Sequence, residues 1–220
     1  MRDEYLASLK CDSCEDAFSH ALPVEDDRNE VIARLVPVGR WALQDGALLR
    51  AFCLWRKTFM RCYRVQFNAS EDSTREYLQN CSIASPDRIF FAIYLPDDSL
   101  VGHLGLSNVS SRKAELDNII RGAAGGGPQL MYFAEKSLLE WGFGTLGLDL
   151  LEAQVLSRNF MAKALHERVG FRTKQSHFLR KTTMAGITRY EICDEAEATE
   201  SFMLDIIELR KSEFLLQDGT

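Results

Sequence analysis

A glycine-rich loop in the middle of the chain has the residue types that hold anions. Residues 121–128 read Arg-Gly-Ala-Ala-Gly-Gly-Gly-Pro and follow an apolar run that is typical of a strand. Proline favours the first helical position, so Pro128 predicts that an amphipathic helix begins there. The glycines leave backbone N–H groups uncovered where the helix dipole is positive. The loop therefore predicts a cradle for an anion, most naturally a phosphate or pyrophosphate.

A second segment with a recognisable pattern lies closer to the C-terminus. Residues 159–171 read Asn-Phe-Met-Ala-Lys-Ala-Leu-His-Glu-Arg-Val-Gly-Phe. Asparagine caps helices and glycine ends them, so we expect a helix over 159–169 with Gly170 as its terminator. On that helix Ala162 and His166 lie one turn apart on the same face.

The spacing of apolar residues predicts the elements that position these two segments. We expect strands at 31–38, 89–95, 100–109, 113–121, 150–156, 171–182 and 187–192. We expect helices at 47–60, 128–141 and 159–169, and a helix start near 68–72. The expected fold is α/β of the α+β type, with a mixed, mostly antiparallel central sheet of about six to seven strands flanked by helices.

Composition and charge limit the kind of protein. The chain has 220 residues, of which 46% are hydrophobic and 26% charged, as in an ordinary globular protein. A net charge of −6 argues against a nucleic-acid partner. No apolar run approaches the ~20 residues that cross a bilayer, and the acidic start does not resemble a secretory signal. We therefore expect a cytoplasmic protein without a nucleic-acid or membrane partner.

Three parts are expected along the chain. Residues 1–29 are polar and predict a loosely attached arm, and residues 30–193 form one domain. Residues 194–220 predict a C-terminal amphipathic helix carrying Phe202, Ile206 and Leu209. That helix could pack on its own domain or on a second copy, so a homodimer stays open.

The six cysteines do not predict a metal site. Cys11 and Cys14 form a Cys-x-x-Cys pair, but a zinc site needs about four ligands. His20 could supply a third, and no fourth is evident. We expect reduced thiols and no metal.

Together the two segments resemble the signatures of the GNAT superfamily of acyl-CoA-dependent N-acyltransferases. The family's pyrophosphate signature, (Arg/Gln)-x-x-Gly-x-(Gly/Ala), is similar to residues 121–126, with alanine at the first glycine position. The second signature, Asn-x-x-Ala-x-x-Leu-Tyr-x-x-x-Gly-Phe, is matched at Asn159, Ala162, Leu165, Gly170 and Phe171. His166 replaces its tyrosine. The glycines alone would also allow a dinucleotide site, but they do not give G-x-G-x-x-G, and an antiparallel meander precedes them.

The resemblance implies a GNAT-like fold and acetyl-CoA, or another short acyl-CoA, as co-substrate. In this family the pantetheine arm pairs with the strand before the glycine loop, and the pyrophosphate meets the loop. The resemblance assigns acyl-CoA binding to Ile119, Ile120, Arg121, Gly122, Gly125, Gly126, Gly127, Asn159 and Ala162. Asn159 could equally be a plain helix cap.

Three residues are candidates for proton transfer. Glu115 and Asp117 share one face of the strand over 113–121, beside the expected thioester. Either carboxylate could deprotonate an amine, with Asp117 the first choice, or both could be surface charges. His166 stands where the family tyrosine protonates the CoA sulfur. It could be that acid, or a polar residue that only lines the slot.

The acceptor is the least constrained part of the prediction. The sequence over 117–122 and the helix start Pro-x-Leu-Met resemble bacterial enzymes that acylate nucleotide-linked amino-deoxysugars. On the predicted first helix, Phe52, Trp55 and Phe59 with Arg56 could stack a base and meet phosphates, or be an ordinary amphipathic face. A protein or peptide N-acetyltransferase is the alternative enzyme. A non-catalytic acyl-CoA-binding domain is the alternative of another class.

Overall fold

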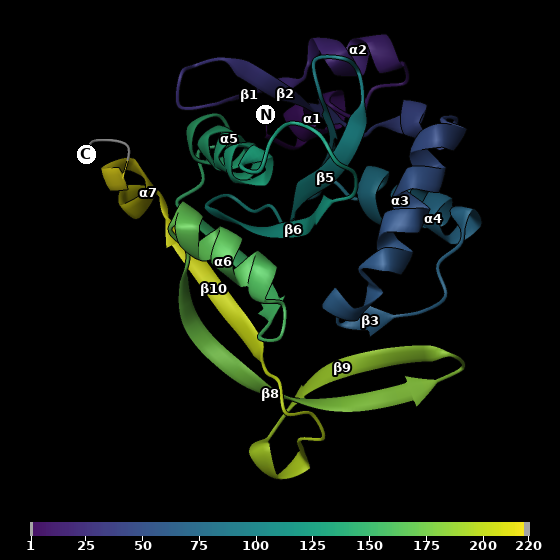
Figure 1. Cartoon of the computed structure of the whole chain (residues 1–220), viewed down its shortest axis with the longest axis vertical. Coiled ribbons are helices and arrows are strands. Elements are labelled where there is room, and N and C mark those ends of the chain that lie inside the picture. Colours follow the sequence, from purple (N-terminus) through teal and green to yellow (C-terminus); the bar gives the residue numbers. More distant parts are fainter. Residues whose placement is uncertain (1, 218–220) are drawn as a thin grey trace.

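The computed structural model describes residues 2–217 of the chain. Its helices are α1 (Arg2–Ser8), α2 (Cys14–Ser19), α3 (Gly46–Thr58), α4 (Glu71–Tyr77), α5 (Leu130–Gly144), α6 (Phe160–Val169) and α7 (Lys211–Gln217). Its strands are β1 (Leu22–Glu25), β2 (Val31–Pro37), β3 (Val65–Gln66), β4 (Ile89–Tyr94), β5 (Leu100–Ser107), β6 (Lys113–Arg121), β7 (Leu150–Leu156), β8 (Arg172–Met184), β9 (Ile187–Cys193) and β10 (Leu204–Arg210). Figure 1 shows their arrangement.

The described strands form one sheet in the order β1-β2-β4-β5-β6-β7-β10-β8-β9-β3. Neighbouring strands are antiparallel except β6 and β7, which are parallel. This confirms the predicted fold class, but the sheet has ten strands, more than the expected six or seven. Of the three additional strands, β1 and β3 are four and two residues long, too short to give a periodic signal, and β10 lies where a helix was expected.

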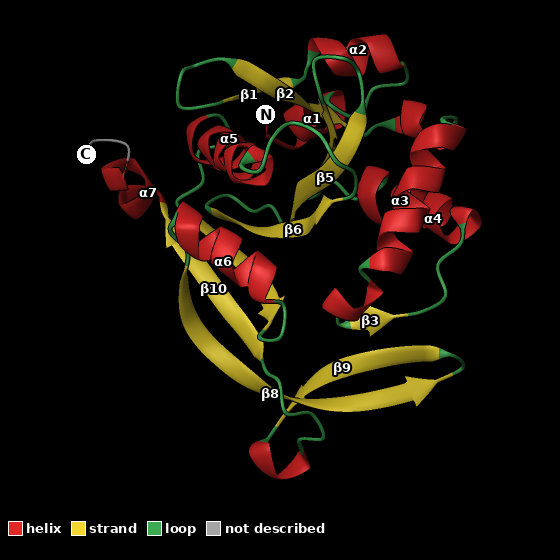
Figure 2. Ribbon diagram, in the orientation of Figure 1, coloured by secondary structure: helices red, strands yellow, loops and turns green. Residues whose placement is uncertain are grey.

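Helices cover both faces of the sheet, as Figure 2 shows. Strand β4 illustrates how its sequence produces two cores. On one face Phe91 packs against Trp141 of α5, and on the other Phe90 packs against Phe52 of α3. Every side chain of β4 is buried, because its alternating positions both meet a helical layer. No helix among residues 2–217 is long and apolar enough to cross a membrane.

The parallel strands β6 and β7 separate along their length. Lys113–Leu116 of β6 pair with Leu150–Ala153 of β7, and within residues 2–217 the rest of β6 has no strand partner on that side. Residues 117–121 therefore leave an open strand edge that leads directly into the glycine-rich loop. Such an edge presents unpaired backbone groups to which an extended amide chain can add.

The expected loosely attached arm is wrong. Residues 2–25 fold onto the domain as α1, α2 and β1, and β1 pairs with β2. Leu6 and Leu9 of this segment, together with Val24, are buried in the main core. The segment is polar overall, but these few apolar side chains are enough to hold it. The domain boundaries drawn from composition stay a prediction.

The expected C-terminal helix is also wrong. Residues 204–210 form β10, between β7 and β8, and only the short α7 follows. Both faces of β10 are covered: Ile207 and Leu209 join the main core, while Ile206 packs with Phe202 against a smaller cluster. Because apolar residues lie on both faces of this segment, Phe202, Ile206 and Leu209 are spaced by four and three residues, which is also the spacing of one helix face.

Candidate active site

The glycine-rich loop has the conformation of an anion cradle. Gly125, Gly126 and Gly127 have φ values of 123°, 65° and 76°, in the region that residues with a side chain seldom adopt. Among the described residues, no backbone hydrogen bond uses the N–H groups of residues 124–127. Helix α5 begins at Leu130 with Gln129 as its N-cap, so Pro128 belongs to the loop and not to the first helical turn. The loop N–H groups are thus free to bind an anion in front of a helix N-terminus.

The first part of the loop is fixed to the protein. The N–H groups of Gly122 and Ala123 both donate to the carbonyl of Val101, at 2.9 and 3.0 Å. A Cβ on Gly122 would lie 1.9 Å from the ring of Trp55, so only glycine fits there. Arg121 donates to the carbonyl of Gly125 at 2.8 Å and closes the loop on itself. Gly122 is therefore a packing glycine, and the exposed N–H groups lie further along the loop.

The two isoleucines that precede the loop differ in environment. Ile120 is buried in the core beneath α3, so only its backbone is available to a ligand. Ile119 is half-buried and packs on the edge of the other core. Their backbone lies on the open part of β6, where the resemblance places pantetheine.

A bulge interrupts β6 at Asn118, which sequence patterning does not reveal. Asn118 has a φ of 55°, and the pairing of β5 with β6 shifts register there. Its carbonyl accepts a hydrogen bond from Nδ1 of His103 on β5, at 2.6 Å. This contact requires the proton of neutral His103 to be on Nδ1. A bulge redirects the backbone and side chains that follow it, so His103 helps to fix the site's geometry.

Asp117 belongs to a hydrogen-bonded network beside the bulge. Its Oδ2 lies 2.8 Å from Nδ2 of Asn118 and 3.2 Å from Arg88. Burial raises the pKa of Asp117, and Arg88 opposes that rise. A carboxylate whose pKa lies above its usual range, yet which is held by a cation, has the character of a general base.

Tyr77 completes this network. Its hydroxyl oxygen accepts hydrogen bonds from Arg88 and from Asn118, each at 2.7 Å. Burial raises the pKa of Tyr77 to about 12, so the phenol keeps its proton at neutral pH. With its oxygen already accepting two bonds, the O–H proton is left to donate to a third group.

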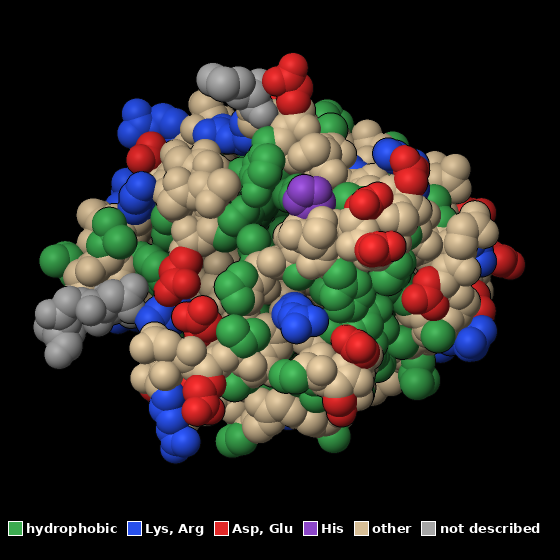
Figure 3. Space-filling model, turned by 90° about the horizontal axis from the view of Figure 1, so that it is seen from above, with side chains coloured by type: hydrophobic (Ala, Val, Ile, Leu, Met, Phe, Trp, Pro, Cys, Tyr) green, Lys and Arg blue, Asp and Glu red, His purple; other side chains and the backbone are tan. Residues whose placement is uncertain are grey.

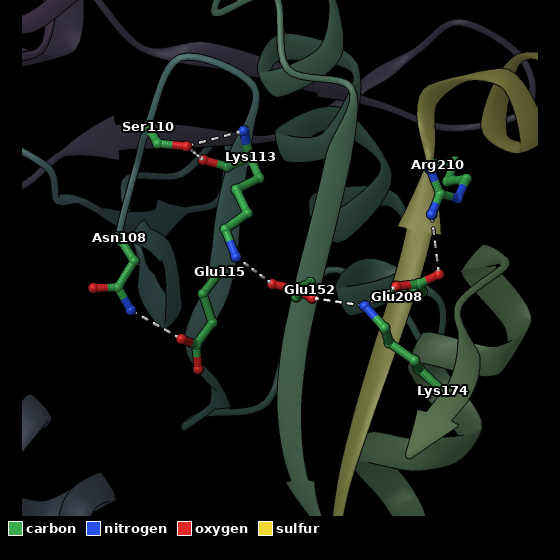
Figure 4. Close-up of polar contacts among 8 residues, drawn as sticks. All are labelled: Asn108, Ser110, Lys113, Glu115, Glu152, Lys174, Glu208 and Arg210. Atoms are coloured by element: carbon green, nitrogen blue, oxygen red, sulfur yellow. Dashed lines mark hydrogen bonds and ion pairs between the residues drawn. The ribbon is translucent and has the colours of Figure 1, made fainter.

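Glu115, the second predicted carboxylate, has a different setting. It accepts a hydrogen bond from Asn108 at 3.0 Å, and burial raises its pKa. Figure 4 shows it beside a row of alternating charges that crosses β6, β7, β10 and β8. In that row Lys113 lies 3.2 Å from Glu152, and Lys174 lies 2.8 Å from Glu208. Glu115 therefore lies beside a structural charge ladder formed by Lys113, Glu152, Lys174 and Glu208.

A pocket of about 100 Å³ opens next to the bulge. Asn118, His103 and Phe90 line it on the sheet side, with Tyr77 from α4 and with Phe52 and Arg56 from α3. The remaining wall includes the rings of Tyr63 and Phe67, and Arg56 is stacked over Tyr63 with its guanidinium carbon 3.3 Å from the ring centre. The residues that were predicted to act together on this helix therefore have two different roles. Phe52 and Arg56 line the pocket, while Trp55 supports the glycine loop.

The residues that match the second signature form the capped helix α6. The side chain of Asn159 accepts from the N–H of Ala162 at 3.4 Å, which is the cap alternative, and α6 ends at Gly170 with a φ of 117°. His166 is buried, and its Nδ1 lies 2.7 Å from Oε1 of Glu135 on α5. Sequence reasoning missed Glu135, although an acidic residue one turn from both Met131 and Leu139 on a helix was a signal. A role of Asn159 and Ala162 in binding acyl-CoA stays a prediction.

Burial of His103 predicts a specific loss of stability in acid. Burial lowers the pKa of His103 to about 4, from an ordinary 6.5. As the pH falls, the unfolded chain binds the proton first, so the stability contributed by neutral His103 is lost between pH 6.5 and 4. We expect the free energy of unfolding in urea to fall by about 2 kcal/mol more for the parent than for His103→Gln between pH 7 and 4.5. An equal fall in both proteins would contradict this, and His20→Gln, at an exposed histidine, is the control.

Figure 3 views the end of the molecule that carries α2, β1 and β2, where hydrophobic side chains gather between scattered acidic ones.

Cys11 is buried and Cys14 exposed, and every cysteine among the described residues is free. Within residues 2–217, no group of three or more His, Cys, Asp or Glu side chains could hold a metal ion.

Comparisons with known proteins agree with this architecture. A spermidine N-acetyltransferase from Vibrio cholerae, in complex with CoA and spermine, is 19% identical with a TM-score of 0.64, over 84% of this chain and 99% of that chain. A protein described as a probable GNAT-family acetyltransferase from Chromobacterium violaceum is 19% identical with a TM-score of 0.62, over 88% of each chain. At this identity the likeness shows the fold. No curated protein matches the sequence.

The family itself is shown by a sequence match. The model of the acetyltransferase (GNAT) domain matches residues 38–172, which is more than half of the chain and includes the glycine loop, the bulge and α6. The match confirms the predicted enzyme class, an N-acyltransferase, and acetyl-CoA as its co-substrate. This chain therefore belongs to the GNAT family of acetyltransferases.

Proposed function

We propose that this enzyme moves an acetyl group from acetyl-CoA to a primary amine that enters through the pocket beside the β6 bulge. The observation that carries the proposal is the position of Asp117, which begins the part of β6 that is not paired with β7 and accepts a hydrogen bond from Asn118, a residue of the pocket wall. The amine nitrogen attacks the thioester carbonyl, and Asp117 takes the amine proton directly or through water. A backbone N–H near Ile119 meets the oxyanion, and His166 protonates the sulfur as it leaves.

We assign acetyl-CoA to the slot where β6 and β7 separate. Its amide-rich arm would pair with the open edge of β6, and its pyrophosphate would meet the uncovered N–H groups of residues 124–127. Arg121, Gly125, Gly126 and Gly127 form that cradle, and Asn159 and Ala162 border it from the start of α6. Gly122 contributes by supporting the loop on Trp55.

For the acceptor, we propose an amine that also carries an anionic group. Arg56 is the charged side chain in the pocket wall, and no carboxylate is among the wall residues. A polycation would meet a like charge there, whereas phosphate or carboxylate would meet an opposite one. A nucleotide-linked amino-deoxysugar fits this class and is favoured by the sequence resemblance. The pocket, at about 100 Å³, would hold only part of it.

A polyamine is the second candidate. The Vibrio cholerae enzyme that shares this fold is a spermidine N-acetyltransferase and was solved with spermine bound. The charge ladder of Figure 4 includes Glu152 and Glu208, and Glu115 lies beside it, so these carboxylates could attract a cation to the neighbouring sheet face. Lys113 and Lys174 already neutralise part of that charge.

A panel of acceptors decides between these classes. CoA thiol release is measured with nucleotide-linked amino sugars, spermidine and short peptides, and each amide product is identified by mass. We expect turnover with anionic amines, and Arg56→Gln should raise their KM at least about tenfold. Turnover confined to spermidine or to peptides would overturn the acceptor class and leave the transferase assignment intact. No acetyl-CoA binding and no turnover would overturn the function.

A further inference from the structure

A histidine and a glutamate are buried together where α5 packs on α6. The side chains of His166 and Glu135 are 5% and 0% exposed, and Nδ1 of His166 lies 2.7 Å from Oε1 of Glu135. The second carboxylate oxygen, Oε2, is buried and has no hydrogen-bond partner among the described residues. Burying a carboxylate with one oxygen unpaired opposes folding, so packing alone does not explain the pair.

We infer that Glu135 is a positioning residue that holds His166 in the state that protonates the departing sulfur. This inference rests on the acetyl transfer proposed above. An ionised Glu135 can accept a hydrogen bond only from a protonated Nδ1, so the contact fixes the ring orientation and its bonded nitrogen. Nε2 is then the ring nitrogen that remains to donate a proton.

The proton count of the pair follows from this geometry. The proposed step requires both ring nitrogens to carry a proton before transfer, opposite an ionised carboxylate, and such a pair has no net charge, which a buried site tolerates best. When the carbon–sulfur bond of the tetrahedral adduct breaks, its electron pair stays on sulfur, and sulfur takes the proton from Nε2. The products are a thiol and a neutral imidazole whose Nδ1–H still donates to Glu135. Water then returns a proton to Nε2, while the amine proton leaves through Asp117.

The tyrosine of the family signature can donate its proton unaided, whereas His166 needs the charge of Glu135 to do so. A tyrosine hydroxyl carries its own proton and needs no partner to donate it. A histidine can present either nitrogen, so its use as an acid at one defined place requires a group that selects the nitrogen. The pairing thus accounts for both residues, since neither a lone glutamate nor a lone histidine would be expected in an apolar helix interface.

A double-mutant cycle tests whether Glu135 acts through His166. Glu135→Gln keeps the shape of the side chain and removes its charge. We expect His166→Ala and Glu135→Gln each to lower kcat at least about tenfold, with the KM for acetyl-CoA nearly unchanged and no further loss in the double variant. Losses that multiply in the double variant, or a parent-like kcat in Glu135→Gln, would overturn the inference.

A matched control separates positioning from structural support. Asp205 is a second buried carboxylate paired with a base on α6, its Oδ2 lying 2.6 Å from Nζ of Lys163. Asp205→Asn should destabilise the protein to a similar degree, as measured by thermal unfolding, and leave kcat within about threefold of the parent. An equal loss of kcat in Asp205→Asn would show that any disturbance of α6 slows the reaction, and would overturn the specific role.

A spectroscopic readout tests the pair without any acceptor, and so separates its failure from failure of the proposed function. The chain has four histidines, which makes ¹⁵N-histidine labelling practical. At pH 7 we expect the Nδ1 resonance of His166, assigned through His166→Ala, to be that of a protonated nitrogen. Glu135→Gln should shift it toward a mixture of tautomers, while His103, whose Nδ1 bonds to Asn118, stays unchanged. Identical His166 resonances in both proteins would contradict the role of Glu135.

Discussion

Asp117→Asn is expected to lower the maximal rate of acetyl transfer by at least about 100-fold, the contribution of a well-placed general base. The substitution keeps the size of the side chain and a hydrogen-bonding oxygen for Arg88, but removes the basic carboxylate. Because Asp117 has a raised pKa, its ionised fraction in the parent grows as the pH rises through that pKa. The parent's rate should therefore fall in acid, and the variant should lack this step. Steady-state rates from pH 4.5 to 8 measure both effects.

Glu115→Gln is the matched control for that variant. It removes a carboxylate of the same strand whose pKa is also raised by burial, but which bonds to Asn108 beside the charge ladder. We expect its rate to stay within about threefold of the parent. If Glu115→Gln lost most of its rate while Asp117→Asn kept the rate of the parent, Glu115 would be the general base and Asp117 would not. Parent-like rates in both would mean that water alone deprotonates the amine.

Gly127→Asp should weaken acetyl-CoA binding at least about tenfold, because a carboxylate placed among the cradle N–H groups repels a pyrophosphate by a few kcal/mol. A Cβ at Gly127 would meet nothing within 4 Å, so the side chain enters open space and does not displace the loop. Isothermal titration calorimetry with acetyl-CoA measures the change in Kd.

Two variants isolate the charge effect at Gly127. Gly127→Ala places an uncharged side chain at the φ of 76°, and should change the Kd by much less. Gly186 has a φ of 77° and equally open space in the β8–β9 turn, so Gly186→Asp adds the same charge far from the cradle. Equal affinity in Gly127→Asp and Gly186→Asp would remove residue 127 from the pyrophosphate site.

The sequence predicted those elements whose apolar pattern is local and strong. Strands β6 and β7 have the predicted bounds, and α6 begins after its Asn159 cap and ends before Gly170, as expected. Prediction failed where pairing partners decided the structure. Strand β10 looked helical because β7 and β8 flank it and both its faces are covered. Residues 2–25 are held on the domain by a few buried apolar side chains, which the average polarity of the segment does not reveal.

The candidate site was predictable only in part, for the same physical reason. Alternation placed Asp117 on the correct strand, but the bulge at Asn118 depends on His103 of the neighbouring strand, which no local pattern indicates. The pocket joins residues from Phe52 to Asn118 that lie on α3, α4, β4, β5 and β6, so it exists only after folding. Glu135 was recognisable as an acidic residue between Met131 and Leu139 at helical spacing, but its partner on α6 was not.

Amide hydrogen exchange with and without acetyl-CoA tests most directly whether the co-substrate occupies the slot between β6 and β7. We expect acetyl-CoA to slow exchange at residues 117–127, where the open strand edge and the uncovered loop N–H groups would gain hydrogen bonds. The β8–β9 turn at Gly186 should exchange at the same rate in both samples. Unchanged exchange over 117–127, with slowing elsewhere, would contradict the proposed binding site.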